Sequence, residues 1–400
     1  MTDLFWPGDH RAGALMSGGA FLDALIAVEN AWLAVLVEHH VAPDSAAAEL
    51  GPLLRDADRD AVAADAERDG NPVTGLVAML RSRAGHDTAR WLHRGLTSQD
   101  VVDTALMLCL RDVLTDVHTQ LSAQVRVLAT MVRTHRTAPM LTRTLTQPAL
   151  PGSAGMKFAG WLGAILDSAD TLACVPAPAV QAGGAAGTMA AATELTGSAD
   201  RALALADALA AKLALATALP WHTSRSRLTR AGDALVTACD CWGHIANDIA
   251  VGGRREIGEF AEGSGGGSST MPHKNNPVLT VLLRRTALTA PPLAATLHAA
   301  SAASVDERAD GGWHAEWAPL RTLARHAVVA ARHATDLLTD LRFDAARAEA
   351  NLIAAQGITA EQQTMAATAG HAPGGAYLGA TAPLVEATLD RAANFLKENS

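Results

Sequence analysis

The sequence has few aromatic residues, few cysteines and no surplus of positive charge. Aromatic residues make up only 4% of the 400, as eight Trp, six Phe and one Tyr, so Ala and Leu must supply most of the core. Both are strong helix formers. With 32 Lys and Arg against 41 Asp and Glu, the formal net charge is −9, which argues against nucleic acid or an anionic membrane as a partner. A small anionic substrate is compatible with this charge, because a single pocket can be basic.

The four cysteines lie in apolar stretches with helical periodicity, at Cys109, Cys174, Cys239 and Cys241. So small a number argues against a disulfide framework, and no second pair at zinc-finger spacing accompanies the last two. They are therefore expected to pack as small core residues. The first residues lack a basic segment followed by an apolar run, and no window of about 18 residues is free of charged or strongly polar side chains. We expect a cytoplasmic protein with no signal peptide and no membrane span.

Runs of alternating β-branched residues are missing, which argues against a sizeable sheet, whereas apolar residues recur at three- and four-residue steps nearly everywhere. Long helices are expected over residues 20–40, 100–136, 151–173, 200–219, 226–260, 276–301 and 315–341. Helices of this length suit a bundle in which each spans most of the molecule. The sequence therefore predicts an all-α protein with three parts: an N-terminal helical domain (1–99), a central long-helix bundle (100–342) and a short C-terminal helical domain (343–400).

Two glycine-rich segments interrupt this helical pattern, at residues 181–187 and 262–272. The second holds four Gly and four Ser or Thr in eleven residues, which costs backbone entropy and contributes nothing to a core. Each could be a linker or a mobile functional loop. Residues 273–277, which follow the second segment, are polar and cationic and lead directly into another predicted helix. This favours a functional loop at 262–277.

The segment 93–100 stands at the head of the longest predicted helix. Thr97 or Ser98 is a suitable N-cap, and Asp100 complements the positive end of the helix. One interpretation is a well-capped helix and nothing more. The other is a carboxylate site made by the free backbone N–H groups and hydroxyls of the helix start.

A second polar segment, 142–148, lies between two predicted helices. Thr144 and Gln147 offer uncharged donors that could orient a carboxylate, and Arg143 could be either a ligand contact or a surface charge. In the glycine-rich loop, Ser268 lies six residues before Lys274, without the patterns of a Walker loop or a GxSxG elbow. A serine hydroxyl can act as a base only if its alkoxide is stabilised, which nearby cations and loop N–H groups can do.

These segments carry a resemblance. Residues 267–277, GSSTMPHKNNP, resemble the signature loop of the fumarase/aspartase superfamily, G-S-S-x-M-P-x-K-x-N. Residues 97–100 resemble its first conserved block, Thr144 and Gln147 fall in its second, and the similarity extends over about residues 1–370. Within the superfamily, five stretches are most similar to the 3-carboxy-cis,cis-muconate cycloisomerase family: 143–147, 155–162, 183–188, 221–225 and 313–317.

The resemblance implies a chemistry in which a proton is removed next to a carboxylate and an aci-carboxylate intermediate is stabilised. It implies Ser268 as the proton-transfer group and Lys274 as its cationic catalytic partner. The implied substrate contacts are Thr97, Ser98, Thr144, Gln147 and Asn276, with His93, Arg225 and His314 as further candidates for the remaining carboxylates. It also implies a small polycarboxylate substrate, no cofactor or metal, and a homotetramer whose active sites are shared between subunits.

The predicted activity is cyclisation of 3-carboxy-cis,cis-muconate to a carboxymuconolactone, in protocatechuate breakdown, by addition of the substrate's own carboxylate. Leu145 occupies the position where lyases of the superfamily carry an acid, and a leucine transfers no proton. The alternative is a β-elimination lyase that acts on a substituted succinate and releases fumarate, and a third hypothesis is a catalytically silent scaffold. Asn275 and Pro148 depart from the Arg and His common in the family, which could indicate a shifted substrate.

Overall fold

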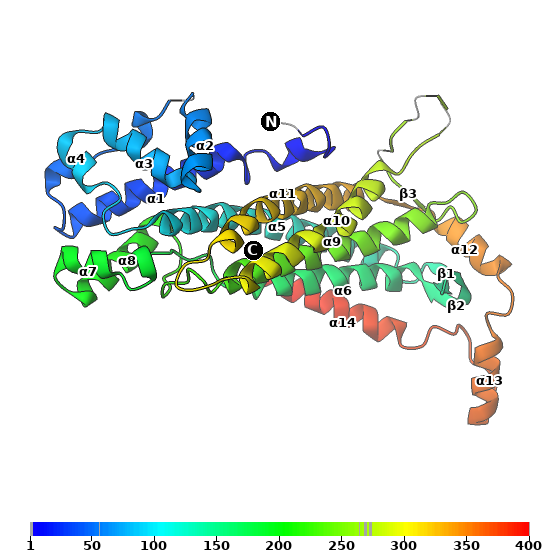
Figure 1. Cartoon of the computed structure of the whole chain (residues 1–400). Helices are drawn as coiled ribbons and strands as arrows, with labels where there is room; N and C mark the ends of the chain where they lie inside the picture. The colour runs from blue at the N-terminus through cyan, green and yellow to red at the C-terminus, as the bar shows by residue number, and fades with distance from the viewer. Residues whose placement is uncertain (1–2, 56, 264, 268–269, 272–273, 400) are drawn as a thin grey trace.

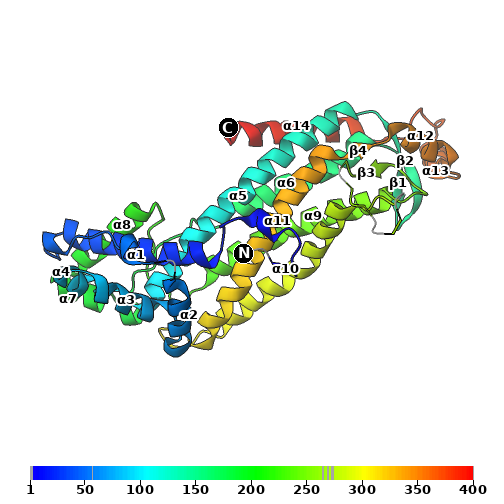
Figure 2. The same cartoon turned by 90° about the horizontal axis from the view of Figure 1, so that it is seen from above.

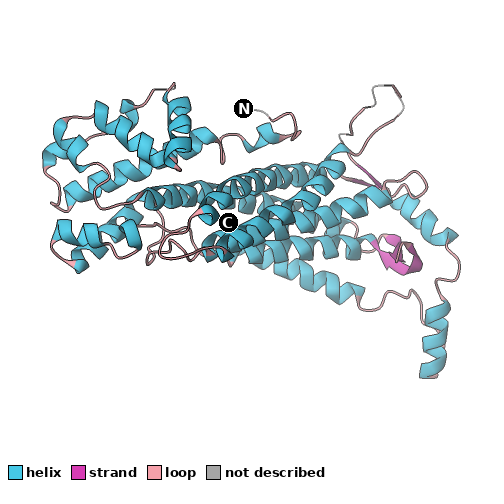
Figure 3. Cartoon of the chain, in the orientation of Figure 1, coloured by secondary structure: helices cyan, strands magenta, loops and turns pink. Residues whose placement is uncertain are grey.

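The chain folds into an elongated assembly of helices in this computed structural model, which describes residues 3–399 except 56, 264, 268–269 and 272–273. Ser268 lies outside the described residues. Figures 1 and 3 show that helices dominate and that the strands form only small antiparallel pairs. The all-α prediction is confirmed.

The helices are α1 (Gly18–Glu38), α2 (Asp58–Asp69), α3 (Pro72–Arg83), α4 (His86–Trp91), α5 (Ser98–Thr134), α6 (Ala154–Ala173), α7 (Ala190–Thr196), α8 (Ala199–Leu213), α9 (Ser226–Gly252), α10 (Val278–Ala302), α11 (Gly311–Asp340), α12 (Ala345–Ala354), α13 (Ala360–Ala369) and α14 (Thr381–Glu398). Short 3-10 helices occupy Asp9–Ala12, Asp44–Ala46, Gly51–Leu53 and Gly184–Ala186. Strand β1 (Pro139–Thr144) pairs with β2 (Gln147–Ser153), and β3 (Phe260–Ala261) pairs with β4 (Arg342–Phe343).

Five long helices, α5, α6, α9, α10 and α11, pack side by side as the central bundle, and α14 runs back along α5 and α6 (Figure 2). The apolar stripe expected for α5 is buried, as Val113, Val117 and Leu121 show. Alanine is common at the contacts between these helices, which lets their backbones approach closely. The helical period therefore identified the faces that build the core.

Two predicted helices end earlier than expected, one where an aromatic ring packs against a glycine and one at a residue in the αL conformation. The helix expected over 226–260 stops at Gly252, where a Cβ would lie 2.3 Å from Cδ2 of Phe260. The missing side chain lets Phe260 fold back onto the end of α9 and pair with Phe343 in the β3–β4 sheet. The helix expected over 200–219 stops at Leu213, and Ala214 follows with φ 50°.

One end of the bundle carries α1 to α4 together with α7 and α8 (Figure 1). Helix α1 packs against both α5 and α8, so part of the predicted central region 100–342 packs with the predicted N-terminal domain. The division into three domains stays a prediction. By length and composition alone α1 could span a membrane, but half of its apolar window is buried, and Val28, Trp32 and Leu36 lie in the core. Burial of this kind is typical of a core helix in a folded domain.

The opposite end carries the β1–β2 hairpin, the loop 262–277, α12 and α13 (Figures 1 and 2). Helix α5 connects the two ends. Its 37 residues correspond to a length of about 55 Å at 1.5 Å per residue. The three candidate segments are therefore divided between two distant ends of the molecule, which we call the capped end (93–100) and the hairpin end (142–148 and 262–277).

Candidate functional site

At the capped end, Thr97 is the N-cap of α5 and forms a capping box with Asp100. The Thr97 N–H donates to Asp100 Oδ2 at 2.9 Å, and the Thr97 side chain accepts from the backbone of Asp100. The Asp100 carboxylate also accepts from the N–H groups of Gly183 and Gly184, both at 2.9 Å, and lies 2.8 Å from His222 Nε2. The glycine-rich segment 181–187 is thus neither a linker nor a lid. Residues 181–184 are buried and fasten to the start of α5, where Gly184 has φ +68°, and Ala185 and Ala186 are exposed.

Arg308 brings a cation to the capped end that the sequence analysis missed. It lies in the connection between α10 and α11, and its Nη1 donates to Thr97 Oγ1 at 2.9 Å. Ser98, the first residue of α5, is partly exposed beside it in sequence. A helix N-terminus, two hydroxyls and a guanidinium together suit a carboxylate. No local pattern marks Arg308, because its neighbours Asp306 and Glu307 make the connection appear as an ordinary charged turn.

His93 is held at the same end by a buried carboxylate. Its Nδ1 lies 2.6 Å from Oε1 of Glu29 on α1. The Glu29 side chain is fully buried, and 17% of the His93 side chain is exposed. Burial alone would lower the pKa of His93, but the Glu29 carboxylate outweighs it and the pKa is raised above the ordinary value. His93 has φ 62°, a left-handed conformation that costs energy for a residue with a Cβ.

Glu29 was also missed from the sequence, although one signal pointed to it. It falls among apolar core positions of α1, between Val28 and Trp32, where a carboxylate is costly unless it is paired. A charged residue on the buried face of an amphipathic helix is such a signal.

Arg225 was predicted to contact substrate and is better explained as part of a buried ion-pair network. Its side chain is 1% exposed. Nη1 and Nη2 donate to the two oxygens of Asp103 at 2.8 and 2.9 Å, while Nε and Nη2 donate to Glu316 and Nη1 also reaches the carbonyl of His222. All five N–H groups of a guanidinium are thereby engaged. Burial raises the pKa of Glu316 to about 7, although Arg225 opposes this.

His314 is exposed, and both of its ring nitrogens lie within hydrogen-bond distance of backbone carbonyls, so neither is free to bind a ligand. Its Nδ1 lies 3.0 Å from the oxygen of Asp310 and its Nε2 lies 2.8 Å from the oxygen of Gly70. These contacts tie the start of α11 to the turn before α3. His314 therefore lies at the capped end, but both of its ring nitrogens are occupied there.

At the hairpin end, Thr144 and Gln147 face each other as the last pair of β1 and β2. The two-residue turn between them is strained, because Leu145 and Thr146 have φ 49° and 68°, values that normally favour glycine or asparagine. Leu145 is 96% exposed. Strain and an exposed apolar side chain at one loop tip are typical of a contact surface.

Arg143 anchors this hairpin. Its Nη1 and Nη2 donate to Glu259 at 2.9 and 2.7 Å, and Glu259 is fully buried. Asn351 of α12 donates to the same carboxylate at 2.8 Å. Arg143 is therefore an orienting residue for the hairpin, which resolves the choice between a ligand contact and a surface charge.

The loop 262–277 is fastened at its base. Gly266 and Asn276 exchange backbone hydrogen bonds of 2.8 and 2.7 Å, and Asn276 Nδ2 donates to the carbonyl of Gly267 at 3.1 Å. Glu262 accepts from the N–H groups of Leu279 and Thr280, the first turn of α10. A Cβ on Gly266 would lie 2.3 Å from Val278, so glycine is needed there. Lys274 is exposed on this loop.

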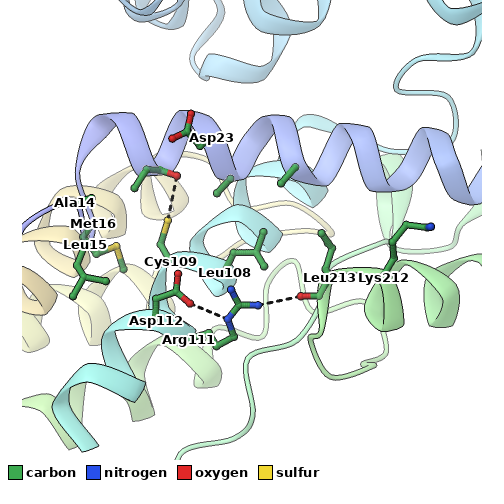
Figure 4. A pocket seen from close by; sticks show the side chains of 13 residues that line it. Ala14, Leu15, Met16, Asp23, Leu108, Cys109, Arg111, Asp112, Lys212 and Leu213 are labelled. Carbon is green, nitrogen blue, oxygen red and sulfur yellow. Dashed lines mark hydrogen bonds and ion pairs between the residues drawn. The ribbon is translucent and has the colours of Figure 1, made fainter. Parts of the chain in front are cut away.

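The predicted site residues of the two ends do not share a pocket in either of the following cases. A pocket of about 460 Å³ opens between α1, α5 and α8 (Figure 4) and contains none of the predicted site residues. Its only thiol, Cys109, donates to the carbonyl of Ala20 at 3.9 Å, and burial raises its pKa to about 12, so it is not a reactive nucleophile. Asn276 lines another pocket, of about 410 Å³, with Arg254. Within one chain, the capped end and the hairpin end stay apart.

Comparison with known proteins gives a consistent set of relatives. A family model described as Lyase matches residues 23–290. Nitrosuccinate lyase from Streptomyces davaonensis is 40% identical over 358 residues, covering 86% of this chain and 75% of that protein. The 3-carboxy-cis,cis-muconate cycloisomerase of Bradyrhizobium diazoefficiens is 39% identical over 316 residues, covering 76% and 68%. The crystal structure of the 3-carboxy-cis,cis-muconate lactonizing enzyme from Pseudomonas putida has a TM-score of 0.78 and 31% identity, covering 94% of this chain and 81% of that one.

Proposed function

The chain belongs to the lyase family of the fumarase/aspartase superfamily, and from this premise we propose that it eliminates an anionic leaving group from a 2-substituted succinate, with nitrosuccinate as the first substrate to test. A base removes a proton from C3, the electron pair of that C–H bond becomes the C2=C3 double bond, and the C2–N bond breaks with its electrons on nitrite. The products are fumarate, nitrite and a proton held by the base. The charge that builds on the neighbouring carboxylate must be stabilised.

The observation that carries this proposal is that cations are left for an anionic substrate at both ends of the predicted site. Arg143 and Arg225 are bound by buried carboxylates. Among the described residues, Lys274 forms no ion pair. The Arg308 guanidinium donates a hydrogen bond to the hydroxyl of Thr97, one of the predicted substrate contacts. Together with the His93 imidazole, which lies against the Glu29 carboxylate at the capped end, these cations can meet the carboxylates of nitrosuccinate and the charge that develops on nitrite.

Leu145 supports a leaving group that needs no proton. Amines and alkoxides are strong bases and leave readily only when an acid protonates them, whereas nitrite is a weak base and leaves as the anion. The leucine at this position therefore argues against succinates that carry an amine or alkoxide leaving group, but not against elimination of a weakly basic anion such as nitrite. The relative that acts on nitrosuccinate is 40% identical to this chain.

The second candidate is cyclisation of 3-carboxy-cis,cis-muconate, which the same leucine also favours. The attacking carboxylate is part of the substrate, so no leaving-group acid is required. Relatives with this activity are 38–39% identical to the chain. The two candidates are distinguished by their products: nitrite and fumarate from nitrosuccinate, or loss of the conjugated-diene absorbance from 3-carboxymuconate.

We expect purified protein to release nitrite and fumarate in equal amounts from nitrosuccinate, and Lys274→Met to lower kcat by about 100-fold or more, the effect of removing one donor to a developing anion. The matched control is Lys212→Met on α8, whose amine pairs with Glu38 on the surface, and its kcat should equal that of the wild type. Diene loss without nitrite release would establish the second candidate. Turnover of neither substrate would leave the scaffold hypothesis.

We further propose that the active site forms only between chains, in a homotetramer. The roughly 55 Å length of α5 separates Thr97 from Thr144, so one chain cannot place both on one small substrate. The exposed tip at Leu145 and an exposed apolar stripe on α10, with Val281 54% and Leu288 80% exposed, support association. Thr144 and Gln147 of one chain would then approach the capped end of a neighbouring chain.

A further inference from the structure

We infer that Glu29 is a positioning residue that keeps the His93 imidazole charged, so that its Nε2–H donates to an oxygen anion of the substrate. This inference rests on the proposed function and assigns a specific task within it. Glu29 reaches no substrate itself, because its side chain is fully buried. It acts through the 2.6 Å contact with His93 Nδ1.

The geometry determines which protonation state can bind an anion. A carboxylate accepts, so the nitrogen beside Glu29 carries a hydrogen in either charge state. In the neutral imidazole, Nε2 is then a bare acceptor that repels an anion. Only the imidazolium has a hydrogen on Nε2, and among the described residues this nitrogen has no hydrogen-bond partner. The substrate therefore needs the charged form.

The surroundings of Glu29 show that the pair is more than a packing contact. Its second oxygen, Oε2, is buried and has no hydrogen-bond partner among the described residues. A carboxylate in this position is costly unless a positive charge stands beside it. Other charges face the imidazole as well, Arg81 from α3 and Asp100 from α5, and they act in opposite directions. The Glu29 carboxylate is the group that makes the cation favourable.

Backbone contacts hold His93 in place at the capped end. Trp32, one turn after Glu29 on α1, donates from Nε1 to the carbonyl of Arg94 at 2.7 Å. Two left-handed residues, His93 and Gly95, complete the turn into Thr97. Helix α1 thus fixes both the backbone and the ring immediately before the N-terminus of α5.

His222 provides a contrast within the same region. Its ring also contacts a carboxylate, Asp100, but the ring is 3% exposed, and that carboxylate already accepts from three backbone N–H groups. Its other ring nitrogen, Nδ1, has no hydrogen-bond partner among the described residues but is buried, so His222 belongs to the structural network around Asp100. His93 keeps one nitrogen available, with a carboxylate that has no other partner.

The test is Glu29→Gln, because the Gln carbonyl still accepts from Nδ1 but lacks the negative charge. We expect KM for nitrosuccinate, and Ki for succinate as a competitive inhibitor, to rise about tenfold at pH 8 for each unit by which the pKa of His93 falls. At pH 6 the difference from the wild type should be smaller, since more of the imidazole is then protonated without the Glu29 charge. A structural defect would give a loss that is equal at both pH values.

The matched control is Glu38→Gln, the same change on the same helix at an exposed glutamate, which should leave KM unchanged at both pH values. In a second variant, His93→Gln, the further change Glu29→Gln should have no added effect on KM, since Glu29 acts through the imidazole. Additive losses in this double-mutant cycle would overturn the inference.

A titration of the His93 ring by NMR, without substrate, separates this inference from the proposed function. We expect the pKa of His93 to be lower in Glu29→Gln than in the wild type. An unchanged titration would overturn the inference even if nitrite is released normally. The other outcome is that the pKa of His93 falls in Glu29→Gln as expected, while the wild-type protein turns over no substrate and binds no succinate. That result would overturn the proposed function, and with it the role of Nε2.

Discussion

Replacing Arg225 with methionine is expected to lower the free energy of unfolding by about 3–5 kcal/mol, the cost of breaking a buried ion pair and leaving its partners unpaired. Asp103 and Glu316 flank the guanidinium, and all three side chains are at most 2% exposed. Methionine fills most of the volume, so the loss is mainly electrostatic. Urea unfolding at one fixed protein concentration measures it, because association with other chains adds to the apparent stability.

The informative control is Glu316→Gln, which removes one charge and leaves Arg225 paired with Asp103. We expect its free energy of unfolding near pH 7.5 to be equal to that of the wild type or higher, because the network loses its excess negative charge. A loss as large as that of Arg225→Met would show that the network depends on its shape and not on its charge balance.

The pH dependence of these two proteins should differ in a defined direction. Because burial raises the pKa of Glu316 to about 7, the folded protein holds a proton there that the unfolded chain has lost. The stability from this group is full below the ordinary carboxyl pKa, falls as pH rises toward 7, and is constant above it. Subtracting the curve of Glu316→Gln from that of the wild type should isolate this decline. A flat difference would contradict it.

Much of the bundle could be predicted from the sequence because its information is local. The three- and four-residue period of α5 or α11 depends only on which positions face inward, and those positions are buried as expected. Helix ends were harder to predict. The end of α9 at Gly252 depends on Phe260 folding back against it, a contact made by residues outside the helical period. The β1–β2 hairpin is similar, since its three prolines, Pro139, Pro148 and Pro151, are unusual in strands.

The same difference between local patterns and contacts between distant residues applies to the candidate site. Thr97, Thr144 and the loop before Lys274 were found because each has a local pattern of caps, turns or glycines. Arg225 was assigned to substrate because a sequence shows its charge but not the partners that neutralise it, which lie 122 and 91 positions away. Glu29 and Arg308 were missed for the same reason: their roles come from contacts with His93 and Thr97 on other elements.

Two variants that are each inactive are expected to regain activity when their chains are mixed, if the active site is shared between subunits as proposed. Arg308→Met removes one cation from the capped end, and Lys274→Met removes one from the hairpin end. In a mixed tetramer some sites receive both wild-type ends, and random assembly makes this fraction about one quarter. Nitrite release from tetramers purified by tags on both chains should then recover to about a quarter of the wild-type rate.

Pairing two defects from the same end provides the control, because no mixed site can then be intact. Thr97→Val combined with Arg308→Met should stay inactive, since both changes affect the one hydrogen bond between these residues. Recovery in this pair would mean that the variants merely stabilise each other. No recovery in the first pair, in tetramers shown to contain both chains, would mean that a single chain builds its own site.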